Sequence, residues 1–144
     1  MANVERTAST VWEGDLAHGN GVLSLKSGAA PDLPVTWASR TERSDGKTSP
    51  EELIAAAHSA CFSMALAHGL AQAGTPADQL DTSATVTFVP GEGITKAALT
   101  VVGRVPGLDE AAFVEAADAA KDGCPVSSAM KGNVELTLDA RLQD

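Results

Sequence analysis

Tyrosine is absent from this 144-residue sequence, and aromatic residues as a whole make up 3% of it. A chain with so few large rings has to build its core from small aliphatic side chains, which let helices and strands approach one another closely. Cysteine is also scarce, with two residues. This number is too small for a secreted disulfide scaffold, and in a reducing compartment a cysteine pair is more often catalytic or redox-active than structural.

Basic residues are few, since 10 Lys and Arg face 19 Asp and Glu for a net charge of -9. Nucleic acid and anionic lipid surfaces are bound through clustered Lys and Arg, so neither is expected as a partner. Residues 1–8 contain no apolar signal core, and the longest apolar stretch, residues 54–70, is interrupted by His and Ser. We therefore expect a cytoplasmic protein without a membrane span.

The length and the balance of residue types predict one folded domain over residues 1–144. Hydrophobic residues make up 44% and charged residues 20%, as in ordinary soluble proteins and unlike disordered chains. A chain of this size buries about two-thirds of the surface that its unfolded form exposes.

Patterns of apolar residues and turn residues predict the order of the secondary structure elements. Runs of Thr, Val and Leu separated by glycines predict two or three short strands in residues 8–37, followed by a polar loop at 41–48. The remaining expected elements are a long helix at 50–73, strands at 82–89 and 95–105 joined by a turn at 90–93, a helix at 109–122, a short helical turn after Pro125, and a strand at 133–142. This order lacks the regular alternation of a parallel α/β fold, so an α+β architecture is favoured.

The long helix has the clearest local signals. Ser49 as N-cap, Pro50 at the first helical position and Glu52 in a capping box predict its start, and Gly74 predicts its end. Its apolar residues go nearly all the way round, which predicts a central helix that is buried on most sides.

The two cysteines differ in their surroundings. Cys61 lies in the middle of the long helix, where a cysteine can serve simply as a small core residue. Cys124 follows Gly123, which ends one helix, and precedes Pro125, which suits the start of another. A thiolate is favoured at a helix N-terminus, so Cys124 is either a reactive thiol or a small capping residue.

Other candidate residues have both structural and functional interpretations. His58, one turn before Cys61, is either a packed core histidine or a neighbour of its thiol, and Glu51 is either a carboxylate that suits the helix dipole or one available to a site. Arg40 and Arg43 are the cations nearest the start of the helix. The scattered histidines and cysteines lack metal-ligand spacing, and there is no phosphate-binding loop or nucleophile elbow, so neither a metal site nor nucleotide chemistry is expected.

Taken together, the motifs resemble one known family. The segment TSPEELIAAAHSACFSMAL at residues 48–66 closely resembles the signature of the OsmC branch of the OsmC/Ohr family. Three further stretches fit the same family in order: WEGDL at 12–16, GCPVS at 123–127 and VELTL at 134–138. The resemblance therefore extends over essentially the whole chain.

The resemblance implies a fold, an activity and a set of site residues. The fold is an OsmC/Ohr-like α+β arrangement of antiparallel sheets packed around a long central helix, in an intertwined homodimer with sites at the subunit interface. The activity is reduction of organic hydroperoxides by thiols, without a cofactor or a metal and with a dithiol such as a lipoyl group as reductant. By position in the motifs, Cys61 matches the peroxidatic cysteine, Cys124 the resolving cysteine and Glu51 the acidic partner, and Arg40 is the best match for the arginine. Arg43 is the alternative arginine, and His18 occupies a position that is often basic in relatives.

Helix geometry adds an argument about the subunits. Glu51 and Cys61 are ten residues apart on one helix, which places them about 15 Å apart along its axis. If both serve one site, Glu51 comes from the other subunit across a twofold axis.

Two other functions remain open from the sequence. The first is a redox-responsive protein on the same fold in which Cys61 is a core residue. The second is a hydrolase or thioesterase with Cys61 as acyl nucleophile, for which an arrangement of His and acid partners is not evident.

Overall fold

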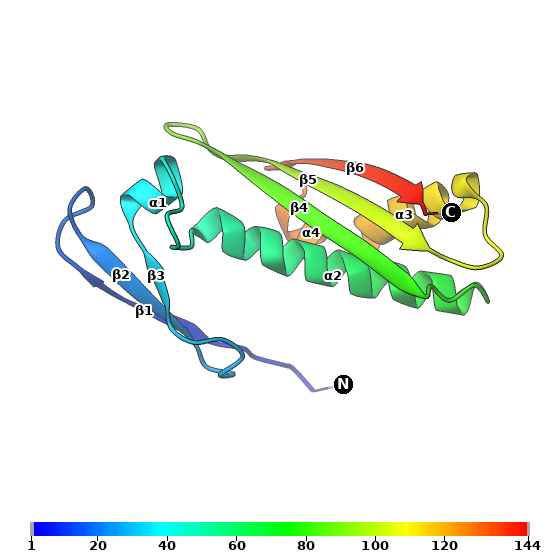
Figure 1. Ribbon diagram of the computed structural model, residues 1–144, viewed down its shortest axis with the longest axis horizontal. Helices are drawn as coiled ribbons and strands as arrows, with labels where there is room; N and C mark the ends of the chain where they lie inside the picture. Colours follow the sequence, from blue (N-terminus) through cyan, green and yellow to red (C-terminus); the bar gives the residue numbers. More distant parts are fainter. Residues whose placement is uncertain (1, 144) are drawn as a thin grey trace. The chain divides into compact units, whose positions relative to one another are not determined.

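The computed structural model describes residues 2–143 (Figure 1). The chain falls into two compact units, of which the first ends at Pro50 and the second begins at Glu51. Each unit is described below by itself.

The first unit contains a small antiparallel sheet and one short helix. Its strands are β1 (Ala8–Glu13), β2 (Asn20–Leu25) and β3 (Leu33–Val35), in the order β1-β2-β3. The expectation of two or three short strands is therefore confirmed. Helix α1 (Trp37–Thr41) was not predicted, although it has a clear capping box in which Thr36 and Ser39 each bond the backbone N–H of the other.

The second unit opens with the long helix α2 (Pro50–Gln72). Its predicted range is confirmed to within one residue. The chain leaves the helix at Gly74, whose φ of 86° is open to glycine at little cost, and the N–H of Thr75 donates to the carbonyl of Leu70 at 2.9 Å. This bond satisfies a carbonyl group that the end of a helix otherwise leaves without a partner.

One face of α2 is buried and the opposite face is exposed. The buried row consists of His58, Phe62, Leu66 and Leu70, whereas Met64 is 68% exposed. The expectation of a helix buried on most sides is thus wrong for the single chain, because Cys61 and Ala65 are only partly buried against the core and Ala56, Ala57, Ala60, Met64 and Ala67 are exposed. By length and composition α2 also meets the criteria for a membrane span, a test that core helices of soluble proteins pass as well.

The second sheet contains β4 (Gln79–Val89), β5 (Gly93–Arg104) and β6 (Glu135–Leu142), in the order β4-β5-β6. Strands β4 and β5 form the predicted antiparallel hairpin, with a bulge between Thr87 and Phe88. Strand β6 pairs with β5 in parallel, so the expectation of antiparallel sheets does not hold for this pair. A parallel partner needs a crossover connection, and here α3 (Glu110–Gly123) and α4 (Pro125–Met130) supply it.

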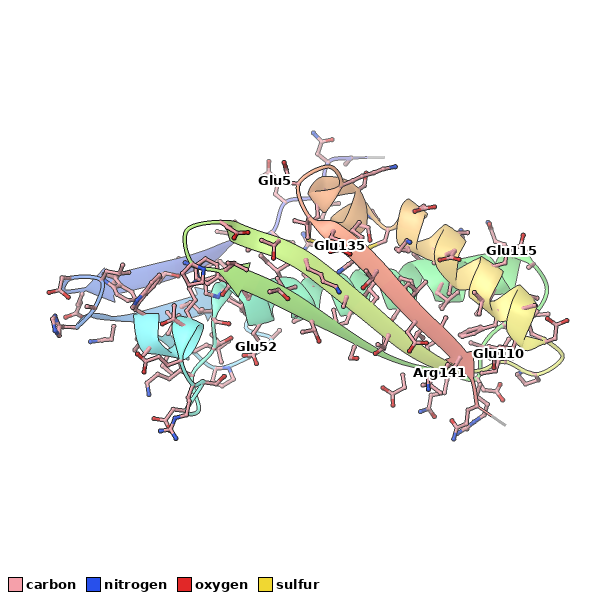
Figure 2. All side chains as sticks on the ribbon, turned by 90° about the horizontal axis from the view of Figure 1, so that it is seen from above. Glu5, Glu52, Glu110, Glu115, Glu135 and Arg141 are labelled. Atoms are coloured by element: carbon pink, nitrogen blue, oxygen red, sulfur yellow. The ribbon has the colours of Figure 1, made fainter. Side chains whose placement is uncertain are left out.

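Helix α3 has the predicted N-cap, since the side chain of Asp109 accepts from the N–H of Ala112 at 2.8 Å. It lies alongside β6, and Figure 2 shows Glu110 and Arg141 at the same end of the two elements. The core of unit 2 joins α2, β5 and α3 through fully or nearly fully buried side chains, among them Phe62, Leu66, Leu99, Val101 and Phe113. Each buried side chain of this size contributes about 1.5–3 kcal/mol relative to exposure, so the core holds both helices against the sheet.

Candidate active site

The fold brings Cys61 and Cys124 together, although they are far apart in the sequence. Cys61 lies in the middle of α2 and is half-buried, while Cys124 lies between α3 and α4 and is completely buried. Both are free thiols, Cys61 packs against the buried cluster that contains Cys124, and each thiol shifts the pKa of the other. The fold thus places the two thiols in one cluster, where each affects the ionisation of the other.

Cys124 is both the C-cap of α3 and the N-cap of α4. Its backbone N–H donates to the carbonyl of Ala120 at 2.9 Å, and its own carbonyl accepts from the N–H of Ser128 at 2.9 Å. Pro125 stands at the start of α4, as predicted. These bonds hold the backbone of Cys124 in an extended conformation between the two helices, with its sulfur in the core.

The pKa of the Cys124 thiol is lowered from its usual value. Burial acts in the opposite direction and raises the pKa, but the Cys61 thiol, the backbone N–H and hydroxyl of Ser127, and the N–H of Val126 together outweigh it. The protonated thiol makes no capping hydrogen bond of ordinary geometry within the described chain. The donors at the start of α4 therefore act mainly on the thiolate.

The pKa of the Cys61 thiol is raised from its usual value. Burial is the largest cause, the bond with Cys124 and the repulsion of a Cys124 thiolate add to it, and the N–H of Val126 opposes it. Two coupled thiols lose their protons in two steps, and the second proton is harder to remove because the first thiolate is already charged. Within unit 2 these shifts favour the first ionisation at Cys124, and a cation near Cys61 would favour a thiolate there.

His58 and Ser127 form a second polar pair beside the cysteines. The Nε2 atom of His58 lies 2.8 Å from the hydroxyl of Ser127, and both residues are buried, with exposures of 0% and 2%. Burial lowers the pKa of His58, so its ring is neutral at physiological pH. Among the residues that the structure describes, nothing bonds the other ring nitrogen, Nδ1.

Ser127 is the site residue that the sequence did not indicate. A polar side chain three positions after a helix cap can reach back to the N–H of the capping residue, as Ser39 does for Thr36, but the N–H of Cys124 is already bonded to Ala120. The spacing of three residues between Cys124 and Ser127 was therefore visible in the sequence as a sign that the two side chains could meet. The bond between Ser127 and His58 on α2 was not visible in the sequence. His58 itself was noted as a possible neighbour of Cys61, and the structure places it next to Ser127.

A groove of about 870 Å³ runs between α2 and α3 and reaches Cys61. Its lining is mostly apolar and includes Met64, Ala65, Leu108 and Ala116. Glu115, which projects from α3 in Figure 2, and His68 are the residues with ionisable side chains other than Cys61 along it. A groove with this lining can hold the hydrocarbon part of a small molecule beside the thiol.

The remaining predicted residues lie in both units. Glu51 is in the first turn of α2 and is 7% exposed. Arg40 is in α1 with its guanidinium over the ring of Trp37, and Arg43 is exposed just after that helix. His18 is exposed, and its Nδ1 lies 3.1 Å from the carboxylate of Asp15. The assignment of Arg40, or of Arg43, as a partner of Cys61 stays a prediction.

The family model described as "OsmC-like protein" matches residues 43–139 of the chain. This range contains both cysteines, Glu51 and His58. It covers most of the second unit and the loop before it.

Two similarities extend over nearly the whole chain. Peroxiredoxin OsmC of Escherichia coli K12 is 42% identical over 143 residues, which cover 97% of this chain and 98% of that protein. The crystal structure of the organic hydroperoxide resistance protein OhrB of Bacillus subtilis has a TM-score of 0.66 and 27% identity, and the alignment covers 93% of this chain and 97% of that one. The fold is also similar to that of an organic hydroperoxide resistance protein from Elizabethkingia anophelis, with a TM-score of 0.73, 23% identity and complete coverage of both chains.

Proposed function

The chain belongs to the OsmC-like family, and we propose that it is a thiol-dependent peroxidase that reduces organic hydroperoxides to alcohols. One observation carries this proposal: two free thiols from distant parts of the sequence lie side by side, and an apolar groove leads to one of them. The relatives named above as a peroxiredoxin and as hydroperoxide resistance proteins support it.

In the first step the Cys61 thiolate attacks the distal oxygen of the hydroperoxide. A sulfur–oxygen bond forms and the oxygen–oxygen bond breaks, so Cys61 becomes a sulfenic acid, and the alkoxide takes up a proton and leaves as the alcohol. Cys61 suits this role because it borders the groove, whereas Cys124 is sealed in the core.

In the second step the Cys124 thiolate attacks the sulfur of the Cys61 sulfenic acid. The disulfide bond forms, the sulfur–oxygen bond breaks, and hydroxide leaves and is protonated to water. The lowered pKa of Cys124 favours the attacking thiolate, and the closeness of the two thiols lets the disulfide form before further oxidation. A dithiol, for which the family resemblance suggests a lipoyl group, then reduces the disulfide and becomes a disulfide itself.

The activation of Cys61 requires a cation, for which Arg40 is the proposed source, with Arg43 as the alternative. A guanidinium stabilises the thiolate and the peroxide oxygens, and the Glu51 carboxylate orients the guanidinium through a bidentate pair. Because burial and Cys124 raise the pKa of Cys61, a cation beside this thiol would counteract both effects.

We further propose that the active protein is a homodimer. The exposed face of α2 carries small and apolar residues that a second copy would cover: Ala56, Ala57, Ala60, Met64 and Ala67. Small side chains permit the close approach of two antiparallel helices. In that arrangement Glu51 of one subunit serves the Cys61 of the other. With this much of α2 covered by protein, we expect a cytoplasmic rather than a membrane-bound enzyme.

Stopped-flow mixing with an organic hydroperoxide tests the proposed function. An enzyme consumes one hydroperoxide per thiol pair and forms the Cys61–Cys124 disulfide. Cys61→Ser should abolish the reaction, and Cys124→Ser should allow one reaction and then accumulate oxidised Cys61 without a disulfide. A redox-responsive protein without catalytic function would react slowly, and its rate would not depend on which cysteine remains.

A further inference from the structure

The mechanism above leaves one buried polar pair unused, His58 of α2 and Ser127 of α4. Both lie where side chains are otherwise apolar, next to Phe62 and the core cysteine Cys124. Burying an imidazole with one nitrogen unbonded costs free energy, and an aliphatic side chain at position 58 would avoid that cost. The pair is therefore a candidate for a function at the adjacent thiols.

The surroundings of the two ring nitrogens indicate which group of the pair donates the hydrogen bond and which accepts it. A neutral imidazole carries one N–H. If that hydrogen were on Nδ1, a buried N–H would have no partner among residues 2–143, and orphaned buried N–H groups are rarer than unpaired acceptors. We assign the hydrogen to Nε2, so His58 donates to the Ser127 oxygen at 2.8 Å. The hydroxyl hydrogen of Ser127 is then directed away from His58.

The position of Ser127 on α4 points to the Cys124 sulfur as the acceptor for this hydrogen. Ser127 is the third residue after the capping residue Cys124, and the backbone groups of Cys124 that a capping serine could reach are engaged by Ala120 and Ser128. The hydroxyl and the N–H of Ser127 both act on the sulfur and favour its charged form. A chain of donors from His58 through Ser127 to Cys124 would give both buried hydrogens an acceptor.

We propose that Ser127 is a further catalytic residue, whose hydroxyl donates to the Cys124 thiolate, and that His58 is the positioning residue that orients this hydroxyl. The proposal rests on the proposed function and adds to it the means by which the second thiol is kept ionised. The pair acts on the attack of Cys124 on the Cys61 sulfenic acid. It acts again when a dithiol attacks the sulfur of Cys61 in the disulfide, since Cys124 then leaves as a thiolate and a better-stabilised thiolate leaves faster.

Few charged groups of unit 2 lie near this chain of donors. On α2, His58 is itself part of the chain of donors, and the titratable neighbour of that chain is the Cys61 thiol. From α3 and the end of α4, Lys121, Asp122 and Lys131 line a shallow pocket that also borders Ser127. The pocket is open to solvent, which screens these charges, so substitution of Ser127 should change the donor and leave their effect on Cys124 in place.

The decisive experiment measures the pKa of Cys124 without peroxide, in a Cys61→Ser background, from the ultraviolet absorbance of the thiolate. The absence of tyrosine removes the tyrosinate signal that usually obscures such titrations. Adding Ser127→Ala should raise the pKa by about one unit, a roughly tenfold loss of thiolate below the pKa. Ser127→Thr keeps the hydroxyl and should restore most of the shift. An unchanged pKa in a folded Ser127→Ala variant would overturn the proposal.

The contribution of His58 is tested with two substitutions in the same background. His58→Leu removes the donor and should raise the pKa of Cys124, while His58→Gln keeps an N–H near the position of Nε2 and should largely restore it. If Leu and Gln have equal effects in folded protein, His58 does not orient Ser127 and its part of the proposal is wrong. If His58→Leu does not fold, the His58→Gln variant decides alone. A Cys124 pKa near that of the parent supports the role of His58, and a Cys124 pKa as high as in Ser127→Ala refutes it.

A single-turnover measurement with both cysteines present links the pair to the reaction. Ser127→Ala should leave the oxidation of Cys61 within about twofold and slow disulfide closure about tenfold at pH values below the pKa of Cys124, in line with the loss of thiolate. Slower oxidation with unchanged closure would contradict the assignment. Because the titration needs no peroxide, a failure of the proposed peroxidase function remains distinguishable from a failure of this inference.

Discussion

The ring of Phe113 lies directly on Gly103. A β-carbon at position 103 would stand 2.5 Å from Cζ and 2.7 Å from Cε2 of this fully buried ring. The contact joins α3 to β5, and α3 ends at Cys124. The position of the second thiol therefore depends on the absence of a single methyl group from the sheet.

Gly103→Ala should destabilise the protein by about 1–3 kcal/mol, the usual cost of overpacking a core. The ring or the helix has to move, so disulfide closure should slow as well. Denaturant unfolding measures the first effect and single-turnover kinetics the second. Gly123→Ala is the matched control, because nothing lies within 4 Å of its β-carbon, and it should be neutral or stabilising by up to about 1 kcal/mol. Equal stabilities for the two variants would refute the packing argument.

Arg40→Gln should slow the oxidation of Cys61 by about 10- to 100-fold, because a neighbouring cation lowers the pKa of an acidic group by about 1–3 units. Arg43→Gln is the control and should retain the rate. The measurement is the pH dependence of the first turnover, which should shift to higher pH in Arg40→Gln. The reverse result would identify Arg43 as the partner of the thiolate.

Subunit complementation tests whether Glu51 acts across a dimer. Glu51→Gln and Cys61→Ser should each be nearly inactive as homodimers. When the two are co-expressed and mix randomly, about a quarter of the activity should return, because half of the dimers contain one intact site of two. Glu52→Gln, which alters the exposed neighbour of Glu51, should be active by itself. A mixture that stays inactive would mean that Glu51 and Cys61 act within one subunit.

Acid should destabilise the protein through His58. Burial holds the folded pKa of His58 below its ordinary value of 6.5, so below pH 6.5 the unfolded state binds a proton that the folded state does not. The free energy of unfolding should therefore fall as the pH drops from 6.5 toward the folded pKa, by at most about 1.4 kcal/mol per unit. Denaturant titrations of His58→Gln should show a smaller slope, while His68→Gln, an exposed residue of the same helix, should keep it.

A charge in the groove should discriminate between substrates by size. Ala119 lines the groove and Ala111 is exposed on the same helix outside it. Ala119→Asp should raise KM for a long-chain alkyl hydroperoxide about tenfold, since excluding two methylene groups costs about 1.6 kcal/mol, and should hardly change KM for tert-butyl hydroperoxide. Ala111→Asp should leave both values unchanged. An equal effect on both substrates would show that the groove does not hold the alkyl chain.

Much of the fold was predictable because its signals are local. Asp109 begins α3 by accepting from the backbone N–H of Ala112, three residues on, and Gly74 ends α2 because glycine tolerates a positive φ. The alternation of Leu136, Leu138 and Ala140 likewise predicts a strand with one packed face, which β6 has. Such signals depend on neighbours within a few residues and need no knowledge of the rest of the chain.

The pairings between distant segments were not predictable in the same way. The alternation of residues in β6 does not indicate whether its neighbouring strand runs parallel or antiparallel to it. The parallel pairing with β5 follows from the crossover through α3 and α4. The apolar residues around α2 predicted burial on most sides, whereas the packing of the single chain leaves Met64 of this helix exposed.

By itself the sequence determined where helices and strands begin and end, and which side chains can carry thiol chemistry. The tertiary structure decided that Cys124 meets Cys61, that His58 bonds Ser127, and that the raised pKa of Cys61 leaves the first negative charge on Cys124. The reason is physical: capping and backbone conformation act over a few residues, whereas burial and hydrogen bonding between side chains depend on groups that only the packing of α2 against α3 and α4 brings within reach.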